Sequence, residues 1–347
     1  MHENSDISKT SQINTYLFFF SKSLRLSNPW NYKVPVLISF TYLVLLLANY
    51  TQSNVFFAFI SSLFIIIGVA GIGYTSNDLG DRKQDKSINR QNILTQLSPF
   101  KIVGLFVLFF ALAIFPWFYL PFNLFSLIFF SSELLLFFLY ALPPFRFKEL
   151  GFLGVLTDSL YAHVLPALLA SYTFFLFTKQ SILSSQVLFM CLLTWQFFLG
   201  LRNILFHQLS DLNDDLVSAT RTFVTKMGEK RAKKLTVILI LLELSCFLFF
   251  LSVLFTKNQI IYLPIMALFF WLWAVFKYKG KLLNSDFRTL TYLFLDDLYV
   301  KWMPLAILIQ LCTISNVYVL LLILHIVLFK NDIKGLVVKH IKKNLQN

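Results

Sequence analysis

Long uninterrupted apolar runs are the feature that most limits how this chain can fold. One of them, VFFAFISSLFIIIGVAGI, extends from Val55 to Ile72 without a charged residue. A run of roughly 18 apolar residues is long enough to cross a bilayer as an α-helix. Only 14% of the residues are charged, against about 25% in soluble domains. These observations predict an all-α polytopic membrane protein.

The apolar runs also predict where the membrane helices lie. The stretch 287–330 is expected to hold one or two helices, with a possible break at TISN, Thr313 to Asn316. The total is therefore nine or ten, and the earlier spans are expected at about 34–50, 54–76, 101–121, 122–142, 151–178, 185–206, 235–256 and 259–276.

Three parts are expected along the chain. Residues 1–33 form a cytoplasmic N-terminal segment, in which residues 14–27 have the pattern of a short amphipathic helix. Residues 34–330 form a single transmembrane domain, and residues 331–347 form a basic tail. We expect no cleavable signal peptide, because the start is polar and partly acidic and its apolar core is short.

The positive charges indicate how the protein sits in the membrane. Most of the 30 Lys and Arg residues lie in the N-terminal segment or in loops that follow even-numbered spans. The opposite loops carry only Lys179 and Lys257. The positive-inside rule places the even-numbered loops in the cytoplasm, most simply in the plasma membrane. Membrane topology thus explains the net charge of +13 without a nucleic-acid partner.

Two clusters of acidic residues stand at the predicted cytoplasmic ends of helices. Asp78, Asp81 and Asp85 follow the second span with spacings that place them on one helical face. Asp211 and Asp215 follow the sixth span and are one helical turn apart, with Asp214 beside them. Six of the 17 acidic residues therefore gather at two places on the same side of the membrane.

Crowded carboxylates repel one another unless a cation offsets their charge. Mg²⁺ suits this role, because it binds one or two carboxylates and completes its shell with water and substrate phosphates. Two facing clusters could hold two or three ions around a diphosphate. The alternative is that the carboxylates are ordinary solvated loop charges. Two clusters on matching helix ends favour the binding site.

At this point the sequence resembles the UbiA-type intramembrane prenyltransferase superfamily. NDLGDRKQD, from Asn77 to Asp85, is similar to that family's NDxxDxxxD motif, and Asp211 to Asp215 is similar to its DxxxD motif. YALPPFRFKELG, from Tyr140 to Gly151, resembles the loop between them, and LRLSNPWNYKVP resembles the approach to the first helix. The resemblance extends from about residue 20 to residue 235.

Two places depart from the family pattern. After the second motif the family often has GxxT and a later glycine, and here these positions are Ala219, Thr222 and Gly228. After Asp85 many members have an Arg-Pro-rich stretch, but this chain has KSINRQN. Both departures affect the choice of acceptor more than the class of reaction.

The resemblance implies a fold, a reaction and a set of site residues. The fold is a ring of helices around a central cavity. The reaction is Mg²⁺-dependent transfer of a prenyl group from an isoprenyl diphosphate to a lipophilic, usually aromatic, acceptor within the bilayer. Mg²⁺ and diphosphate would be held by Asn77, Asp78, Asp81, Asp85, Asp211 and Asp215. Arg146 and Lys148 would contact phosphate oxygens, with Arg25, Lys83 and Tyr140 as weaker candidates.

Other ionisable residues lie within predicted spans, where a charge is costly and a function or a partner is expected. Asp158 either contacts the acceptor or orders the active site, or else it makes an interhelical hydrogen bond. His207 and Gln208 either orient Asp211 or cap the helix end. The interpretations of the remaining acidic groups are structural: Glu133 and Glu243 within spans, and Asp296 and Asp297 paired locally with Lys301.

Three rival functions remain. The same fold serves phosphoribosyl transfer, other prenyl-lipid syntheses and terpene cyclisation. A CDP-alcohol phosphotransferase would need a DGxxAR motif, which the sequence lacks. A transporter would place its polar residues at mid-membrane and commonly shows an inverted repeat, whereas these carboxylates gather at helix ends on one side. The transferase is favoured.

Overall fold

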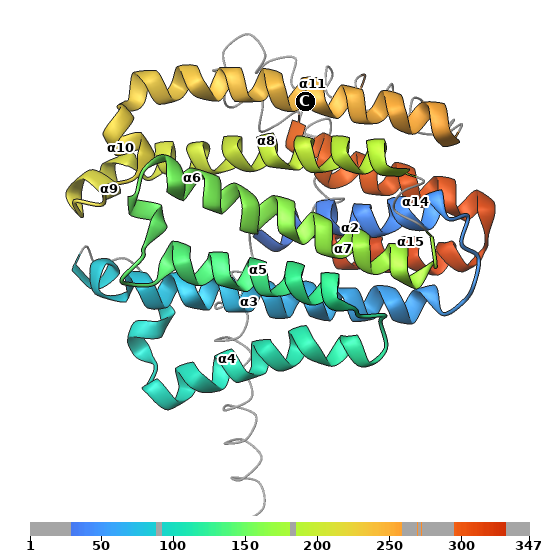
Figure 1. Cartoon of the computed structure of the whole chain (residues 1–347), viewed down its shortest axis with the longest axis horizontal. Coiled ribbons are helices and arrows are strands. Elements are labelled where there is room, and N and C mark those ends of the chain that lie inside the picture. The colour runs from blue at the N-terminus through green and yellow to red at the C-terminus, as the bar shows by residue number, and fades with distance from the viewer. Residues whose placement is uncertain are drawn as a thin grey trace, which may run out of the picture.

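The structure is a computed structural model that describes residues 29–87, 92–180, 185–258, 269, 272 and 295–330. The predicted amphipathic helix at 14–27, nearly all of the predicted span at 259–276 and the basic tail at 331–347 lie outside these residues. Within them the fold is all-α, as predicted (Figure 1). The expected domain boundaries stay a prediction.

Apolar helices account for most of the described chain. Six of those in the described ranges are long and apolar enough to cross a membrane, and three shorter ones accompany them. The helices are α2 (Pro29–Leu47), α3 (Val55–Ser87), α4 (Pro99–Ile114), α5 (Leu124–Ala141), α6 (Phe152–Ser159), α7 (Leu165–Phe177), α8 (Gln186–Ser210), α9 (Leu212–Val217), α10 (Phe223–Met227), α11 (Glu229–Asn258), α14 (Met303–Ile314) and α15 (Val317–Leu328).

The long helices lie side by side in a bundle (Figure 1). α3 packs against α4 and α5, α2 packs against α7 and α14, and α8 packs against α6 and α11. The apolar side chains between them form one large core, while many Phe, Leu and Val side chains on the outer surface are exposed. Exposed apolar side chains on long helices are the pattern that a lipid environment requires. The protein is an integral membrane protein.

The connections after α3, α5 and α8 gather at one end of the bundle, on the left in Figure 1. α3 has 33 residues, or about 50 Å of helix, whereas the hydrocarbon core is about 30 Å thick. Its last turns therefore extend beyond the apolar layer and carry the first acidic cluster. α3 and α5 approach closely there, because a Cβ atom on Gly80 would overlap the carbonyl oxygen of Ala141.

The predicted span at 151–178 is interrupted in the structure. A π-helical turn at Leu160–Val164 separates α6 from α7, and Pro166 follows it in the first turn of α7. Proline has no N–H to give to the carbonyl four residues earlier, which accounts for the altered hydrogen bonding. The predicted span itself is confirmed, because Phe152–Phe177 forms one apolar segment long enough to cross a membrane. Single π turns occur frequently at functional sites, and this one contains Tyr161.

The C-terminal pair of helices agrees with the sequence. α14 ends at Ile314, α15 begins at Val317, and the two pack against each other. The break at TISN is therefore confirmed, and both helices are short. The choice between nine and ten membrane helices stays a prediction, because most of the interval between α11 and α14 lies outside the described residues.

Candidate active site

The first acidic cluster lies on the last turns of α3. The helix continues to Ser87, so the expected shared face exists. Asn77, Asp81, Gln84 and Asp85 line a polar pocket of about 130 Å³. At 100° per residue these four positions span one side of the helix. Asp78 lies at the edge of that side; it is buried and does not line the pocket.

The second acidic cluster forms the opposite wall of the same pocket. Asp211 and Asp215 both line it. α8 ends at Ser210 and α9 begins at Leu212, so Asp211 lies at a break between helices and not on one continuous helix. The backbone N–H of Asp215 still donates to the carbonyl of Asp211 at 2.8 Å, which keeps the pair one turn apart. Asp214 is exposed and outside the pocket.

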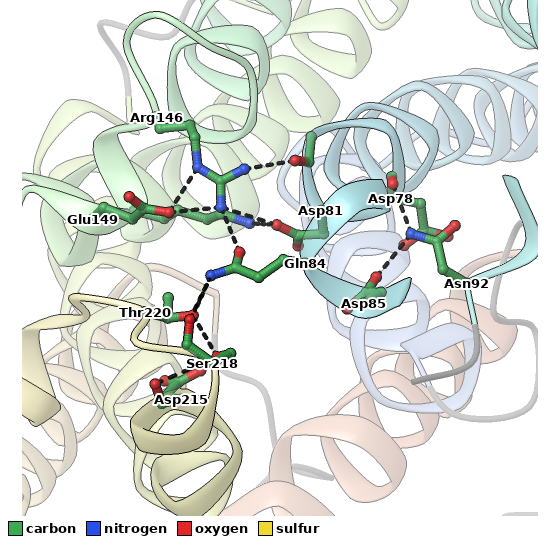
Figure 2. A network of polar contacts seen from close by, with 12 residues as sticks. Asp78, Asp81, Gln84, Asp85, Asn92, Arg146, Glu149, Asp215, Ser218 and Thr220 are labelled. Carbon is green, nitrogen blue, oxygen red and sulfur yellow. Dashed lines mark hydrogen bonds and ion pairs between the residues drawn. The ribbon is translucent and has the colours of Figure 1, made fainter. Parts of the chain in front are cut away.

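The loop between α5 and α6 is fixed to α3 by Arg146 (Figure 2). Its guanidinium donates to the Gly80 carbonyl at 2.6 Å, to Gln84 Oε1 at 2.8 Å and to Asp81 Oδ1 at 3.3 Å. It also donates to Glu149 Oε1 at 2.7 Å. Arg146 does not line the pocket. Its geometry is that of a positioning residue, and the predicted phosphate contact stays a prediction.

Lys148, on the same loop, reaches into the pocket. Its ammonium group pairs with Asp81, and the residue lines the pocket while being only 8% exposed. Burial lowers the pKa of the Lys148 ammonium below its ordinary value, although the neighbouring Asp81 carboxylate opposes this. A bound polyanion would favour the charged form further. Lys148 is thus the loop cation best placed to meet a phosphate.

Asn92 supports the first cluster from behind. Its side-chain amide donates to Asp85 Oδ2 at 2.8 Å and to the backbone carbonyl of Asp78 at 2.7 Å. Figure 2 shows Asn92 beside both aspartates, on the far side of α3 from Arg146. Asn92 was not singled out from the sequence, since only the fold brings it back onto α3.

The loop after α9 closes the pocket. Gln84 on α3 donates to Thr220 Oγ1 at 2.6 Å, and this contact links the two walls. Ala219 has φ +54°, a left-handed conformation that glycine adopts most readily. The expected family glycine therefore matches a backbone requirement, which this chain meets with alanine. Thr222 caps α10 and Gly228, at φ +85°, ends it.

The polar residues next to the second cluster divide their roles. His207 Nδ1 lies 3.5 Å from Asp211 Oδ2, as expected for a residue that orients this carboxylate. Gln208 instead accepts a hydrogen bond from the backbone N–H of Val224 at 3.2 Å, so it fixes the start of α10. The first alternative thus describes His207, whereas the contact of Gln208 with α10 is neither of the two.

An apolar cavity of about 230 Å³ adjoins the polar pocket. Asn77, Tyr140 and His207 line both spaces and so mark their junction. Near it three aromatic rings cluster: the centroid of Tyr161 lies 4.5 Å from that of Phe137 and 5.1 Å from that of Tyr140. A hydrophilic head group and a hydrocarbon tail could therefore occupy one continuous site. The predicted central cavity is present.

Asp158 lines the apolar cavity and not the polar pocket. The hydroxyl of Tyr161, in the π turn, donates to Asp158 Oδ1 at 2.5 Å. The hydrogen bond lies within the α6–α7 segment, so the interhelical bond considered for Asp158 is not the contact observed. Its predicted role toward the acceptor stays a prediction.

The polar pocket has the ligand types of a Mg²⁺ site. Within the described ranges, no three His, Cys, Asp or Glu side chains converge as a ready-made metal cage. The pocket does carry three side-chain amides and four carboxylates on its two walls. Mg²⁺ prefers such oxygen ligands, needs only one or two carboxylates and takes its other ligands from water and phosphate. These residues fit Mg²⁺ bound together with a diphosphate.

A buried cluster of charged residues that lies away from this pocket was not predicted from the sequence. Arg202, inside the predicted sixth span, donates to Glu243 at 2.5 Å and 3.2 Å and to Asp296 at 3.0 Å. The prediction that Asp296 pairs locally was wrong, since only Asp297 pairs with Lys301. The signal was available: an arginine within an apolar span needs an acidic partner, and Glu243 lies in the next span.

The fold and site define a helical membrane protein in which an acidic pocket adjoins an apolar cavity. Comparison with protein families gives the same class: the model of the UbiA prenyltransferase family matches residues 37–298. The chain therefore belongs to the UbiA prenyltransferase family. The comparison with curated proteins gave no match.

Solved structures with this fold support the assignment. A UbiA homolog from Archaeoglobus fulgidus bound to GPP and Mg²⁺ superposes with a TM-score of 0.57 at 15% identity, over 84% of this chain and 99% of that chain. A digeranylgeranylglyceryl phosphate synthase superposes with a TM-score of 0.55 at 14% identity, over 86% and 99%. At these identities the likeness concerns the fold.

Proposed function

We propose that this protein transfers a prenyl group from an isoprenyl diphosphate to a lipophilic, aromatic acceptor within the membrane, with Mg²⁺ as cofactor. The observation that carries the proposal is the junction of two unlike spaces. A pocket walled by two acidic clusters opens, at Asn77, Tyr140 and His207, into an apolar cavity. An isoprenyl diphosphate has the same two parts, a polyanionic head and a hydrocarbon tail.

The head group would lie between α3 and the α8–α9 break. Asn77, Asp81, Asp85, Asp211 and Asp215 supply oxygen ligands from the two walls. Mg²⁺ bound there would neutralise negative charge that develops on the departing diphosphate. Asp78 is also proposed as a ligand, from the edge of the first wall. Similarity to a homolog whose structure holds GPP and Mg²⁺ supports the choice of ion and of head group.

The reaction begins with cleavage of the allylic C–O bond, and the electron pair leaves with the diphosphate. Lys148, which already bonds Asp81, supplies positive charge beside the leaving group. Arg146 holds the Lys148 loop against Gly80 and Gln84, so the cation is positioned before the substrate arrives. The acceptor then donates an electron pair to the prenyl carbon and loses the proton from the atom that forms the new bond; this proton passes to the released diphosphate or to water.

The allylic cation has to be kept away from water until it meets the acceptor. The apolar cavity provides a dry environment. The rings of Phe137, Tyr140 and Tyr161 cluster near its junction with the polar pocket. Aromatic faces attract cations over short distances. We assign these three rings the role of stabilising the cation, and Asp158, bound to Tyr161, the role of orienting the acceptor.

The pocket is proposed to open to the cytoplasm. The pocket lies at the end of the bundle that carries the loops after α3, α5 and α8, and these loops are rich in Lys and Arg. Soluble isoprenyl diphosphates could reach it there. Labelling of a single cysteine placed at Asp214 in sealed bacterial cells tests this: protection from an impermeant reagent is expected, and labelling contradicts it.

The direct test uses purified protein, geranylgeranyl diphosphate and a lipid extract of membranes. Prenylated lipid and inorganic diphosphate should appear with Mg²⁺ and not with EDTA. Asp78→Ala and Asp211→Ala should abolish the reaction while the proteins remain monodisperse in detergent. If no isoprenyl diphosphate of any chain length reacts or binds with Mg²⁺, the transferase proposal is wrong and a transporter becomes the better explanation.

A further inference from the structure

Glu133 lies in the middle of α5, at the depth of the membrane interior. Asn123 caps the start of α5, and Tyr140 lies near its other end, at the junction of the two spaces. Seven residues separate Glu133 from Tyr140, which is about 10 Å along the helix. Glu133 lines the apolar cavity at this depth.

The carboxyl group of Glu133 has no partner among the described residues. Its side chain is 2% exposed, and Oε2 is buried without a hydrogen bond. The other buried carboxylates in the spans differ: Glu243 binds Arg202, and Asp158 accepts from Tyr161. Glu133 is therefore a polar group that faces a cavity and that the surrounding helices leave unsatisfied.

An unsatisfied buried polar group is costly, and the cost is greater within a membrane. Ser62 and Thr173 line the same cavity, but each hydroxyl donates to a carbonyl of its own helix. The free lone pairs of these hydroxyls are hydrogen-bond acceptors. A carboxyl group buried without a cationic partner is neutral, so Glu133 offers one O–H donor and one acceptor oxygen. The complementary ligand therefore carries a hydroxyl group, which donates and accepts at once.

We propose that Glu133 recognises a hydroxyl group on the acceptor, deep in the apolar cavity. The inference rests on the proposed function, in which two substrates share the cavity. An isoprenyl tail is a hydrocarbon without a hydrogen-bond donor, so it cannot satisfy Glu133. The donor group belongs to the acceptor, which is accordingly a lipophilic phenol or alcohol. Glu133 acts as a specificity residue about 10 Å from the diphosphate junction.

A matched pair of probes tests this. 4-Nonylphenol donates a hydrogen bond, whereas its methyl ether, 4-nonylanisole, cannot. Equilibrium binding of both tritiated probes is measured with the full chain in nanodiscs. The wild type should bind the phenol about tenfold more tightly, because the ether cannot donate a hydrogen bond to the Glu133 carboxyl oxygen. Glu133→Leu should lose the preference, and Glu133→Gln, which keeps an acceptor oxygen, should retain part of it.

Ser171→Ala is the control for the binding experiment. Ser171 is buried in α7, donates to the Ala167 carbonyl and does not line the cavity, so the phenol preference should stay unchanged. Equal binding of phenol and ether to the wild type would overturn the proposal. Persistence of the preference in Glu133→Leu would also overturn it.

Thermal unfolding without probe provides a second readout. Because Glu133→Leu removes an unsatisfied carboxyl group, it should raise the midpoint of unfolding. A lower midpoint would show that Glu133 supports the fold, which contradicts a recognition role. Mg²⁺-dependent binding of geranylgeranyl diphosphate is measured on the same samples. Its absence from the wild type counts against the proposed function, whereas the phenol preference depends only on Glu133.

Discussion

Arg146 and Arg202 each bind two acidic side chains, but in very different surroundings. Arg146 is 17% exposed, and its partner Asp81 lines the polar pocket. Arg202 is fully buried with Glu243, in the interior of the bundle. Exposed partners can exchange a protein contact for a ligand. Buried partners cannot make this exchange. The contacts of Arg202 with Glu243 and Asp296 therefore hold α8, α11 and the segment before α14 together.

The exposure of an ion pair to solvent and ligand, and not its hydrogen-bond geometry, therefore indicates whether it serves binding or folding. Both arginines donate hydrogen bonds to two carboxylates at 2.5–3.3 Å. Burying a charged pair brings little net stability, whereas removing one partner leaves a charge that the interior cannot solvate. Substitutions should therefore affect folding at Arg202 and catalysis at the Arg146 network.

The largest effect is expected for Glu243→Leu. This change leaves Arg202 with only Asp296 and should lower the free energy of unfolding by about 3–5 kcal/mol. Denaturant unfolding in detergent measures it. Glu229→Leu is the matched control, because Glu229 pairs with Lys233 on the surface, and no measurable change is expected. The triple variant Arg202→Met, Glu243→Leu and Asp296→Asn, which leaves no charge of the cluster unpaired, should recover much of the loss; no recovery would contradict the pairing.

Asp81→Asn should remove activity and leave folding intact. The carboxylate faces the pocket and pairs with Lys148 and Arg146. We expect turnover to fall by roughly 100-fold or more, the usual effect of removing a charge-stabilising group. Asp214→Asn, on the exposed side of α9, should retain near-normal turnover. A comparable loss in both variants would show that pocket access does not determine the effect.

Arg146→Lys should have an intermediate effect. Lysine keeps the charge but loses the planar fork that contacts Gly80, Asp81, Gln84 and Glu149 at once. The Lys148 loop then loses its anchor, and the dissociation constant of geranylgeranyl diphosphate should rise about tenfold, which corresponds to about 1.4 kcal/mol. Lys230→Ala, an exposed charge on α11, should leave binding unchanged. Unchanged binding in Arg146→Lys would exclude the positioning role.

The smallest effect is expected for Ala219→Gly. Ala219 has φ +54°, which costs an L-residue about 1 kcal/mol. Glycine removes this strain but gains freedom in the unfolded chain. The net change should be a stabilisation of about 0.5 kcal/mol, measured as a higher midpoint of thermal unfolding. Ala219→Val should shift the midpoint the other way; equal midpoints for both variants would contradict the strain.

The sequence predicted local features well. Apolar runs located the helices, and the i, i+3, i+7 spacing placed three aspartates on one face of α3 because the helix continues to Ser87. Features that depend on long-range contacts were less accessible. Asn77 lines the pocket and Asp78 does not, and the side-chain amide of Asn92 donates to Asp85. The contact between Arg202 and Asp296 joins residues that are distant in the chain.

The central claim is that acidic residues from α3 and from the α8–α9 break form one Mg²⁺–diphosphate pocket. The most direct measurement is binding of geranylgeranyl diphosphate at increasing Mg²⁺ concentrations to the wild type, Asp81→Asn and Asp215→Asn. The account predicts that binding requires Mg²⁺ and that both variants raise the Mg²⁺ concentration needed. A shift in only one variant, or binding that persists in EDTA, would contradict a shared site.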